Sequence, residues 1–155
     1  MPNSDRKEKY LLVYDTEYSK TLKITAEEVA KRKQLAIYNV SAFRVSYAKE
    51  NHTNATPLDF VNMIDGASYI VSNSFHATAF SLIFEKDFCV VNRSEDINER
   101  MQSLLESYGI LNRLVKLDDL NSCFQAIDYS TLRDQIKHNI LQSKTFLANN
   151  FMSSK

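Results

Sequence analysis

Short apolar runs alternate along the chain with amphipathic stretches, and this alternation predicts the fold. Apolar runs rich in Val, Ile, Leu, Tyr and Phe suit strands that are buried on both faces of a sheet. The runs that predict strands are 10–14, 35–40, 69–71, 88–91 and 114–115. The stretch 41–55 is polar and irregular, so we expect a loop there, with 43–45 as a possible short strand.

The stretches between these runs carry helix signals. Thr56, Pro57 and Asp59 form an N-terminal capping pattern, and Thr25 with Glu28 predicts another capping box. Gly66 and Gly109 stand where helices should end. The predicted helices are 25–34, 57–66, 77–86, 98–108 and 130–149, the last with Leu132, Ile136, Ile140 and Phe146 on its buried face.

Strands and helices therefore alternate from one end of the chain to the other. This order predicts a Rossmann-like three-layer α/β domain with a mainly parallel sheet. No repeat or interdomain linker interrupts it, so residues 1–155 are expected to form a single domain. We expect the ends, 1–8 and 151–155, to be loose.

Composition excludes several functional classes. The 155 residues are 44% hydrophobic, 25% charged and neutral overall, and no apolar run approaches the length of a membrane span, so we expect no nucleic-acid partner and no transmembrane segment. Because the first nine residues are polar and charged, we expect a cytoplasmic protein. Only two glycines are present, so a P-loop and a GxGxxG fingerprint are both excluded.

Neither the cysteines nor the histidines indicate a metal site. Cys89 and Cys123 stand in apolar surroundings outside any CxxC pair, so we expect small buried hydrophobes. His52 in the polar loop and His138 on the last predicted helix are expected to be solvated. Because the three histidines are scattered and none has a second one at ligand spacing, we expect no metal site. We also expect no cofactor.

The candidate site is the segment Ser72-Asn73-Ser74-Phe75-His76, which leaves the strand 69–71 and enters the helix at Ala77. Ligands of open parallel sheets bind beyond the carboxyl ends of strands, and a helix N-terminus favours an anion. Hydroxyl and amide groups could hold that anion, and His76 could transfer a proton. The alternative is that these residues only cap the helix. The predicted binding residues here are Ser72, Asn73, Ser74 and Thr78, with His76 as the catalytic residue.

Arginines near this pole offer a further anion contact. Arg93 follows the strand 88–91 directly and is the candidate of choice. Arg100 on its helix is interpreted as a solvated or ion-paired side chain. Asp118 and Asp119 are interpreted as caps of the turn into 120–125 rather than as acid–base groups.

Residues 56–88 resemble the polysaccharide pyruvyl transferase family. The family carries a P-x-x-F helix, then a run A-D-x-V-x-T-x-S-F-H-G-T-A-F-S, then F-x-K-P-F. This chain matches most of these positions, and downstream it fits the family pattern with Arg100, Leu104-Leu105, Gly109, Leu111 and Arg113. It departs with Ala67-Ser68 for Ala-Asp, Ala77 for Gly and Asp87 for Pro.

The resemblance implies the C-terminal lobe of a two-lobed fold of glycosyltransferase-B (GT-B) type. It implies transfer of a pyruvyl group from phosphoenolpyruvate to a sugar of an exopolysaccharide or cell-envelope glycan, with the family's N-terminal lobe missing here or supplied by a partner chain. Branches of the family read Ser-Arg-Leu-His at the site, so His76 carries over, whereas Ser74 stands at the Arg position. Arg93 is a candidate substitute for that Arg.

Two other functions stay open. The domain could be the nucleotide-sugar-binding lobe of a glycosyltransferase, with Glu95 or Asp96 holding a ribose. It could also be a non-catalytic binding or assembly module completed by another polypeptide, which an exposed apolar patch or a stable dimer would indicate.

Overall fold

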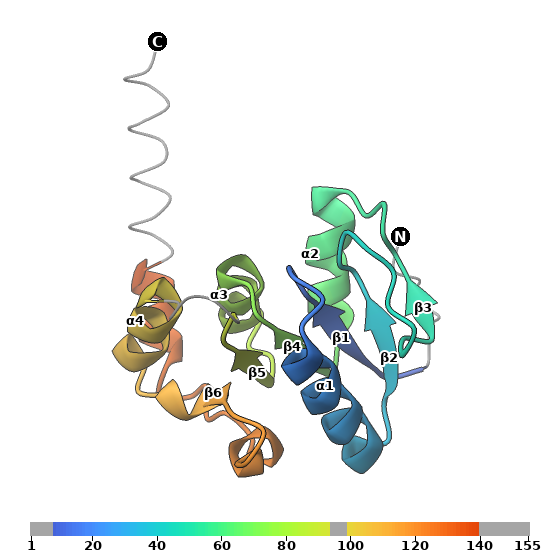
Figure 1. Cartoon of the computed structure of the whole chain (residues 1–155). Coiled ribbons are helices and arrows are strands. Elements are labelled where there is room, and N and C mark those ends of the chain that lie inside the picture. The colour runs from blue at the N-terminus through green and yellow to red at the C-terminus, as the bar shows by residue number, and fades with distance from the viewer. Residues whose placement is uncertain (1–7, 94–98, 140–155) are drawn as a thin grey trace.

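The computed structural model describes residues 8–93 and 99–139, and it has the predicted three-layer α/β architecture (Figure 1). Six parallel strands form one sheet in the order β3-β2-β1-β4-β5-β6. The strands are β1 (Tyr10–Tyr14), β2 (Ala36–Asn39), β3 (Glu50–Asn51), β4 (Tyr69–Ser72), β5 (Phe88–Val91) and β6 (Leu114–Val115). The helices are α1 (Lys20–Lys33), α2 (Pro57–Gly66), α3 (Phe75–Ile83) and α4 (Glu99–Ser107), with short 3-10 turns η1 (Leu111–Arg113) and η2 (Asn121–Phe124).

Each face of the sheet supports its own hydrophobic core. Alternate strand residues point to opposite faces, so Leu11 and Val13 contact α1, whereas Leu12 faces α2, α3 and α4. The α1 side is completed by Leu22, Val29 and neighbours from β4, β5 and η2. Figure 1 shows α1 in front of the sheet and α2 behind it. Burial on both faces explains why β1, β5 and the first three residues of β2 and β4 form continuous apolar runs.

The capping pattern of α2 forms as predicted. Thr56 Oγ1 accepts a hydrogen bond from Asp59 N at 3.1 Å, and Asp59 Oδ2 accepts one from Thr56 N at 3.1 Å. These bonds hold the pKa of Asp59 below its ordinary value. The strands at 10–14, 69–71, 88–91 and 114–115 are likewise confirmed to within a residue.

Three local predictions are wrong. The first long helix begins at Lys20, because Ser19 Oγ caps Leu22 N, and Thr25 lies inside the helix with its hydroxyl donating to Thr21 O. The possible strand 43–45 does not form, and a two-residue strand at 50–51 pairs with β2 instead. Helix α3 begins two residues before Ala77, because Ser74 is its cap.

Residues 127–129 are hydrogen-bonded to the turn between α3 and β5. The Tyr129 hydroxyl donates to Lys86 O, and burial raises its pKa. Asp87, which stands at a proline position of the family pattern, accepts a hydrogen bond from Ile127 N at 2.9 Å. Residues 133–139 are helical, so this helix begins later than the predicted residue 130. Leu132, just before it, and Ile136, within it, are buried as predicted. The rest of the predicted final helix, including Ile140 and Phe146, lies outside the described residues.

Gly109 ends α4 in a left-handed conformation. Its φ is +70°, and the bonds Gly109 N to Glu106 O and Ile110 N to Leu105 O close the last turn. No heavy atom lies within 4 Å of the position that a Cβ would take. An added side chain would therefore be penalised by the backbone conformation and not by a clash.

We expect Gly109→Ala to lower the free energy of unfolding by about 1 kcal/mol, because alanine disfavours positive φ. Gly109→Asn should lower it less, since Asn tolerates this conformation. Urea unfolding of the two variants tests this expectation, and an alanine variant as stable as the parent chain would contradict it.

Candidate functional site

The predicted site lies where the order of the strands reverses. β1 pairs with β2 on one side and with β4 on the other. After β1 the chain continues to β2, and after β4 it continues to β5, so the connections from β1 and β4 run in opposite directions along the sheet. This switch point is where open α/β sheets bind ligands, at the carboxyl ends of the strands. Tyr14, the last residue of β1, is level with Ser72, the last residue of β4. The loops that follow these residues therefore meet.

Asp15 is the centre of a buried polar network at this point. Its carboxylate accepts hydrogen bonds from Glu17 N at 2.9 Å, Ser19 N at 2.8 Å and Asn73 Nδ2 at 3.0 Å. Its own N–H donates to Ser41 Oγ at 2.7 Å. The side chain is only 2% exposed, so these donors replace water around the carboxylate.

Asn73 joins the two loops with both ends of its amide. Its Nδ2 donates to Asp15, and its Oδ1 accepts from Thr16 N and Thr16 Oγ1, each at 3.0 Å. Asn73 is fully buried. The amide therefore fixes the loop after β4 to the loop after β1.

The predicted hydroxyl ligands are buried beneath the start of α3. Ser72 Oγ donates to Tyr14 O at 2.7 Å and accepts from Ser74 N at 2.9 Å. Ser74 caps the helix, and Thr78 Oγ1 donates to Ser74 O at 3.0 Å. The structure brings Ser72, Asn73, Ser74 and Thr78 together as predicted, with their side chains bonded to the protein itself.

His76, in contrast, is exposed in the first turn of α3. It borders a cavity of about 400 Å³ whose walls are mainly apolar. Within the described chain, the N–H groups of Phe75 and His76 have no hydrogen-bond acceptor, as is usual in the first turn of a helix. Two free donors and the helix dipole give this spot a positive potential. The wall residues are Tyr14, Val40, Ala42, Thr53, Ala55, Thr56, Pro57, Phe60, Val61 and Phe80.

The two arginines near this pole differ in what they contact. Arg93 is exposed just beyond β5, and among the described residues it forms no hydrogen bond or ion pair with the segment 72–78. Arg100 stacks on Phe75, with its guanidinium 4.3 Å from the ring centroid. Arg100 is exposed, as expected for a solvated side chain, and the cation–π contact at the start of α3 adds to that exposure. Glu95 and Asp96 lie outside the described residues.

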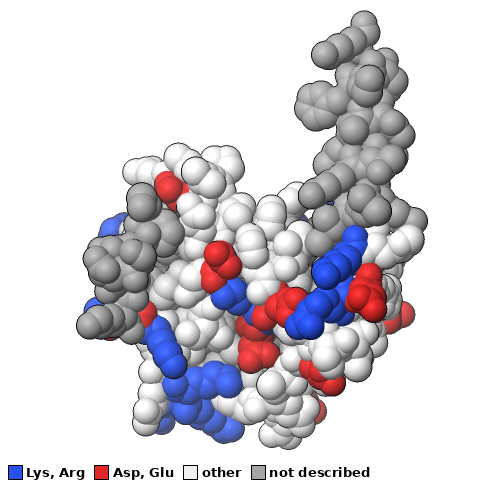
Figure 2. Space-filling view, turned by 180° about the vertical axis from the view of Figure 1, so that it is seen from behind, with Lys and Arg blue, Asp and Glu red and all other residues white. Residues whose placement is uncertain are grey.

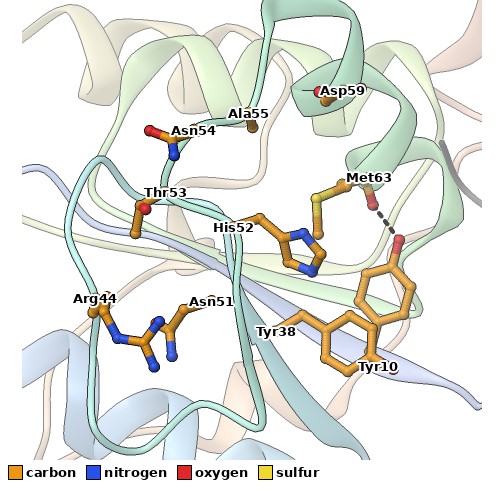
Figure 3. Close-up of a pocket in the computed structure, with 10 residues that line it drawn as sticks. All are labelled: Tyr10, Tyr38, Arg44, Asn51, His52, Thr53, Asn54, Ala55, Asp59 and Met63. Atoms are coloured by element: carbon orange, nitrogen blue, oxygen red, sulfur yellow. Dashed lines mark hydrogen bonds between the residues drawn. The ribbon is translucent and has the colours of Figure 1, made fainter.

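A second cavity, of about 480 Å³, was missed by the sequence analysis (Figure 3). It lies between α2 and the edge of the sheet at β2 and β3, and it shares Thr53 and Ala55 with the His76 cavity. Arg44 and His52 project from the loops around it (Figure 3). A hint was available in the polar stretch 41–55, since long loops beside strand ends often carry function.

The other cysteine, arginine and histidine side chains lie outside the segment 72–78. Cys89 and Cys123 are buried free thiols, as predicted, and burial raises the pKa of Cys89. Arg113 is buried and donates to Phe88 O and Gln125 O. His138 is exposed as expected, whereas His52 pairs with Glu50 at 2.9 Å. No group of three potential metal ligands occurs in residues 8–93 and 99–139.

We expect Asn73→Ala to lower the free energy of unfolding by about 2–3 kcal/mol, because buried groups of Asp15 and Thr16 would each lose a partner. Asn62→Ala is the matched control: Asn62 is half-buried on α2, and its side chain forms no hydrogen bond to another described residue, so the change should be less than about 0.5 kcal/mol. Denaturant titration compares the two. Equal effects would contradict a special role of the Asn73 amide.

Comparisons with known proteins agree with the resemblance in the sequence. Comparison with the curated proteins and with the solved structures gives no significant match. No helix in the described parts of the chain combines the length and hydrophobicity that a bilayer span needs. The model of the family described as polysaccharide pyruvyl transferase matches residues 2–95, which include the whole pole from β1 to β5. This match covers more than half of the 155 residues, and the chain belongs to the polysaccharide pyruvyl transferase family.

Proposed function

We propose that this chain binds phosphoenolpyruvate at the first turn of α3 and takes part in transferring its pyruvyl group to a sugar of an exopolysaccharide or cell-envelope glycan. The observation that carries the proposal is the position of His76. It lies within the family match, is exposed, and borders a cavity at the switch point of the sheet. We place the reaction in the cytoplasm, where phosphoenolpyruvate is produced.

The first turn of α3 supplies what an anionic donor needs. A carboxylate or phosphate oxygen would accept hydrogen bonds from Phe75 N and His76 N, and the helix dipole would stabilise its charge. Ser72, Asn73, Ser74 and Thr78 remain the proposed binding segment. Because their side chains already bond to the protein, we propose that they act by holding the helix start in place.

His76 would move a proton during the transfer. When two sugar hydroxyl groups form a ketal with C2 of phosphoenolpyruvate, the bond between C2 and the phosphate oxygen breaks. One hydroxyl proton ends on C3, and the other ends on the departing phosphate. An imidazole can carry a proton near neutral pH, so His76 is suited to assist the phosphate as it leaves.

A cation should accompany the histidine, because Ser74 stands where related sequences carry arginine. Arg93 remains a proposed substitute, since it is exposed beyond the neighbouring strand β5. Arg100 is a second one, because its guanidinium already lies against Phe75 in the first turn of α3. Either would supply the charge-assisted hydrogen bonds that a serine lacks.

A second function is favoured by one observation. The strand order 3-2-1-4-5-6 is that of dinucleotide-binding folds, so a nucleotide-sugar could occupy the same pole. The two functions differ in the ligand that the pole prefers. In both, the activity of the whole protein would need a second lobe, as in the GT-B arrangement, or a partner chain.

We expect phosphoenolpyruvate, titrated into the isotope-labelled chain, to shift the backbone amides of residues 74–78, and His76→Ala to abolish these shifts. The variant should change the free energy of unfolding by less than about 0.5 kcal/mol, because the side chain is exposed. His138→Ala removes another exposed histidine and is the matched control, which should bind like the parent chain.

A nucleotide-sugar is titrated in parallel. Shifts with the nucleotide-sugar alone would overturn the pyruvyl-donor assignment in favour of a glycosyltransferase lobe. Unchanged phosphoenolpyruvate binding in His76→Ala would remove His76 from the site.

A further inference from the structure

The second cavity, between α2 and the edge of the sheet, has no place in the donor site described above. Its volume of about 480 Å³ is in the range of small-molecule sites, which run from about 300 to 1,000 Å³. Tyr10 and Tyr38 stack at one side of it, with ring centroids 4.5 Å apart (Figure 3). Thr53, Asn54 and Arg44 bring polar groups to the other side. Aromatic rings beside hydroxyl, amide and guanidinium donors are a lining suited to a sugar.

Arg44 is the cation of this lining that the protein leaves uncompensated. In the described residues no carboxylate forms an ion pair with it. The Asp59 carboxylate of the lining accepts from Thr56 N in the capping box and does not pair with Arg44, and His52 contacts Glu50. Arg44 is exposed, so its guanidinium is available to a ligand.

The backbone on both sides of Arg44 is held by the side-chain amides of Asn39 and Asn51. Asn39 Nδ2 donates to Phe43 O at 2.7 Å, and Asn51 Oδ1 accepts from Val45 N at 2.8 Å. Asn39 and Asn51 also bond to each other at 2.8 Å. The Phe43 ring is covered by Tyr18 at a centroid distance of 3.7 Å. The loop therefore presents Arg44 from a fixed position, which lowers the entropy cost of binding.

This cavity adjoins the one that His76 borders. Thr53 and Ala55 line both, and the loop 42–44 runs along them, with Ala42 in the His76 cavity and Arg44 in the second. A chain of sugars could therefore occupy the second cavity with one unit while the next reaches His76. Few charged side chains appear in the upper part of the face opposite α1 (Figure 2), and Arg44 is the arginine of the cavity lining that can recognise an anion.

We propose that this second cavity binds an acidic sugar unit of the glycan acceptor, whose carboxylate is bound by Arg44. The proposal rests on the proposed transfer to a glycan and names the class of acceptor. It also predicts binding that does not need phosphoenolpyruvate. The sugar ring would lie toward Tyr10 and Tyr38, and its hydroxyl groups toward Thr53 and Asn54.

The test uses methyl β-D-glucuronide and methyl β-D-glucoside, which differ in the carboxylate alone, with acetate as the anion without a sugar. The glucuronide should shift the amides of residues 51–55 in the labelled chain. Arg44→Gln, which keeps hydrogen-bonding capacity and loses the charge, should weaken glucuronide binding roughly tenfold or more. Arg32→Gln on the exposed side of α1 removes the same charge elsewhere and should leave binding unchanged.

Each other result overturns the proposal in a recognisable way. Equal affinity for glucoside and glucuronide would make the cavity a neutral-sugar site. Acetate binding as tight as the glucuronide would leave only an anion contact. Unchanged glucuronide binding in Arg44→Gln would remove Arg44 from the site. Because the donor test is read at residues 74–78 and this one at 51–55, failure of one is distinguishable from failure of the other.

Discussion

The hydrogen bond between the Asn73 amide and the Asp15 carboxylate is the contact on which the functional pole depends. A carboxylate that is 2% exposed costs several kcal/mol unless donors surround it, and Asp15 has three. Two of these donors are backbone N–H groups, Glu17 N and Ser19 N, and they bend the chain into α1. The third comes from Asn73, directly before the cap of α3. One buried carboxylate therefore sets where both helices begin.

This constraint separates the residues that build the pole from those that can meet a ligand. Ser72, Asn73, Ser74 and Thr78 are buried and hydrogen-bonded, so they define the direction in which α3 leaves the sheet. What remains at the surface is His76, with the free N–H groups of the first turn and Arg100 on Phe75. A rigid base below an exposed histidine is the arrangement that the proposed proton transfer by His76 requires.

Much of the fold could be predicted from the sequence, because the strands are buried on both faces and appear as short apolar runs. The start of α2 was equally clear, since Thr56, Pro57 and Asp59 act within one turn. Helix α1 was placed too late because Thr25 and Glu28 mimic a capping box, whereas the true cap, Ser19, depends on the distant Asn73–Asp15 contact through its own N–H. Strand β3 could not be predicted, because its two polar residues form a strand only through pairing with β2.

The candidate site, like the fold, was predictable from the sequence only in part. The segment 72–76 was predictable, because a polar run between an apolar strand and a helix marks the carboxyl end of a strand. Asp15 was visible as the polar residue after the first strand, but its side-chain partner Asn73 is 58 positions away, beyond any local pattern. The second cavity is formed by side chains from β1, β2, α2 and two loops, so only the packed structure could reveal it. Arg44 draws its fixed position from Asn39 and Asn51, which sequence alone does not connect.

Native-state hydrogen exchange in Asn73→Ala tests the central claim most directly. If the Asn73 amide sets the starts of both helices, exchange should become faster at Leu22, in the first turn of α1, and at Thr78, in the first turn of α3. The amide of Phe60, which bonds to Thr56 O at the start of α2, should keep its protection relative to them. A uniform increase at all three amides, or no increase at Leu22 and Thr78, would contradict the account.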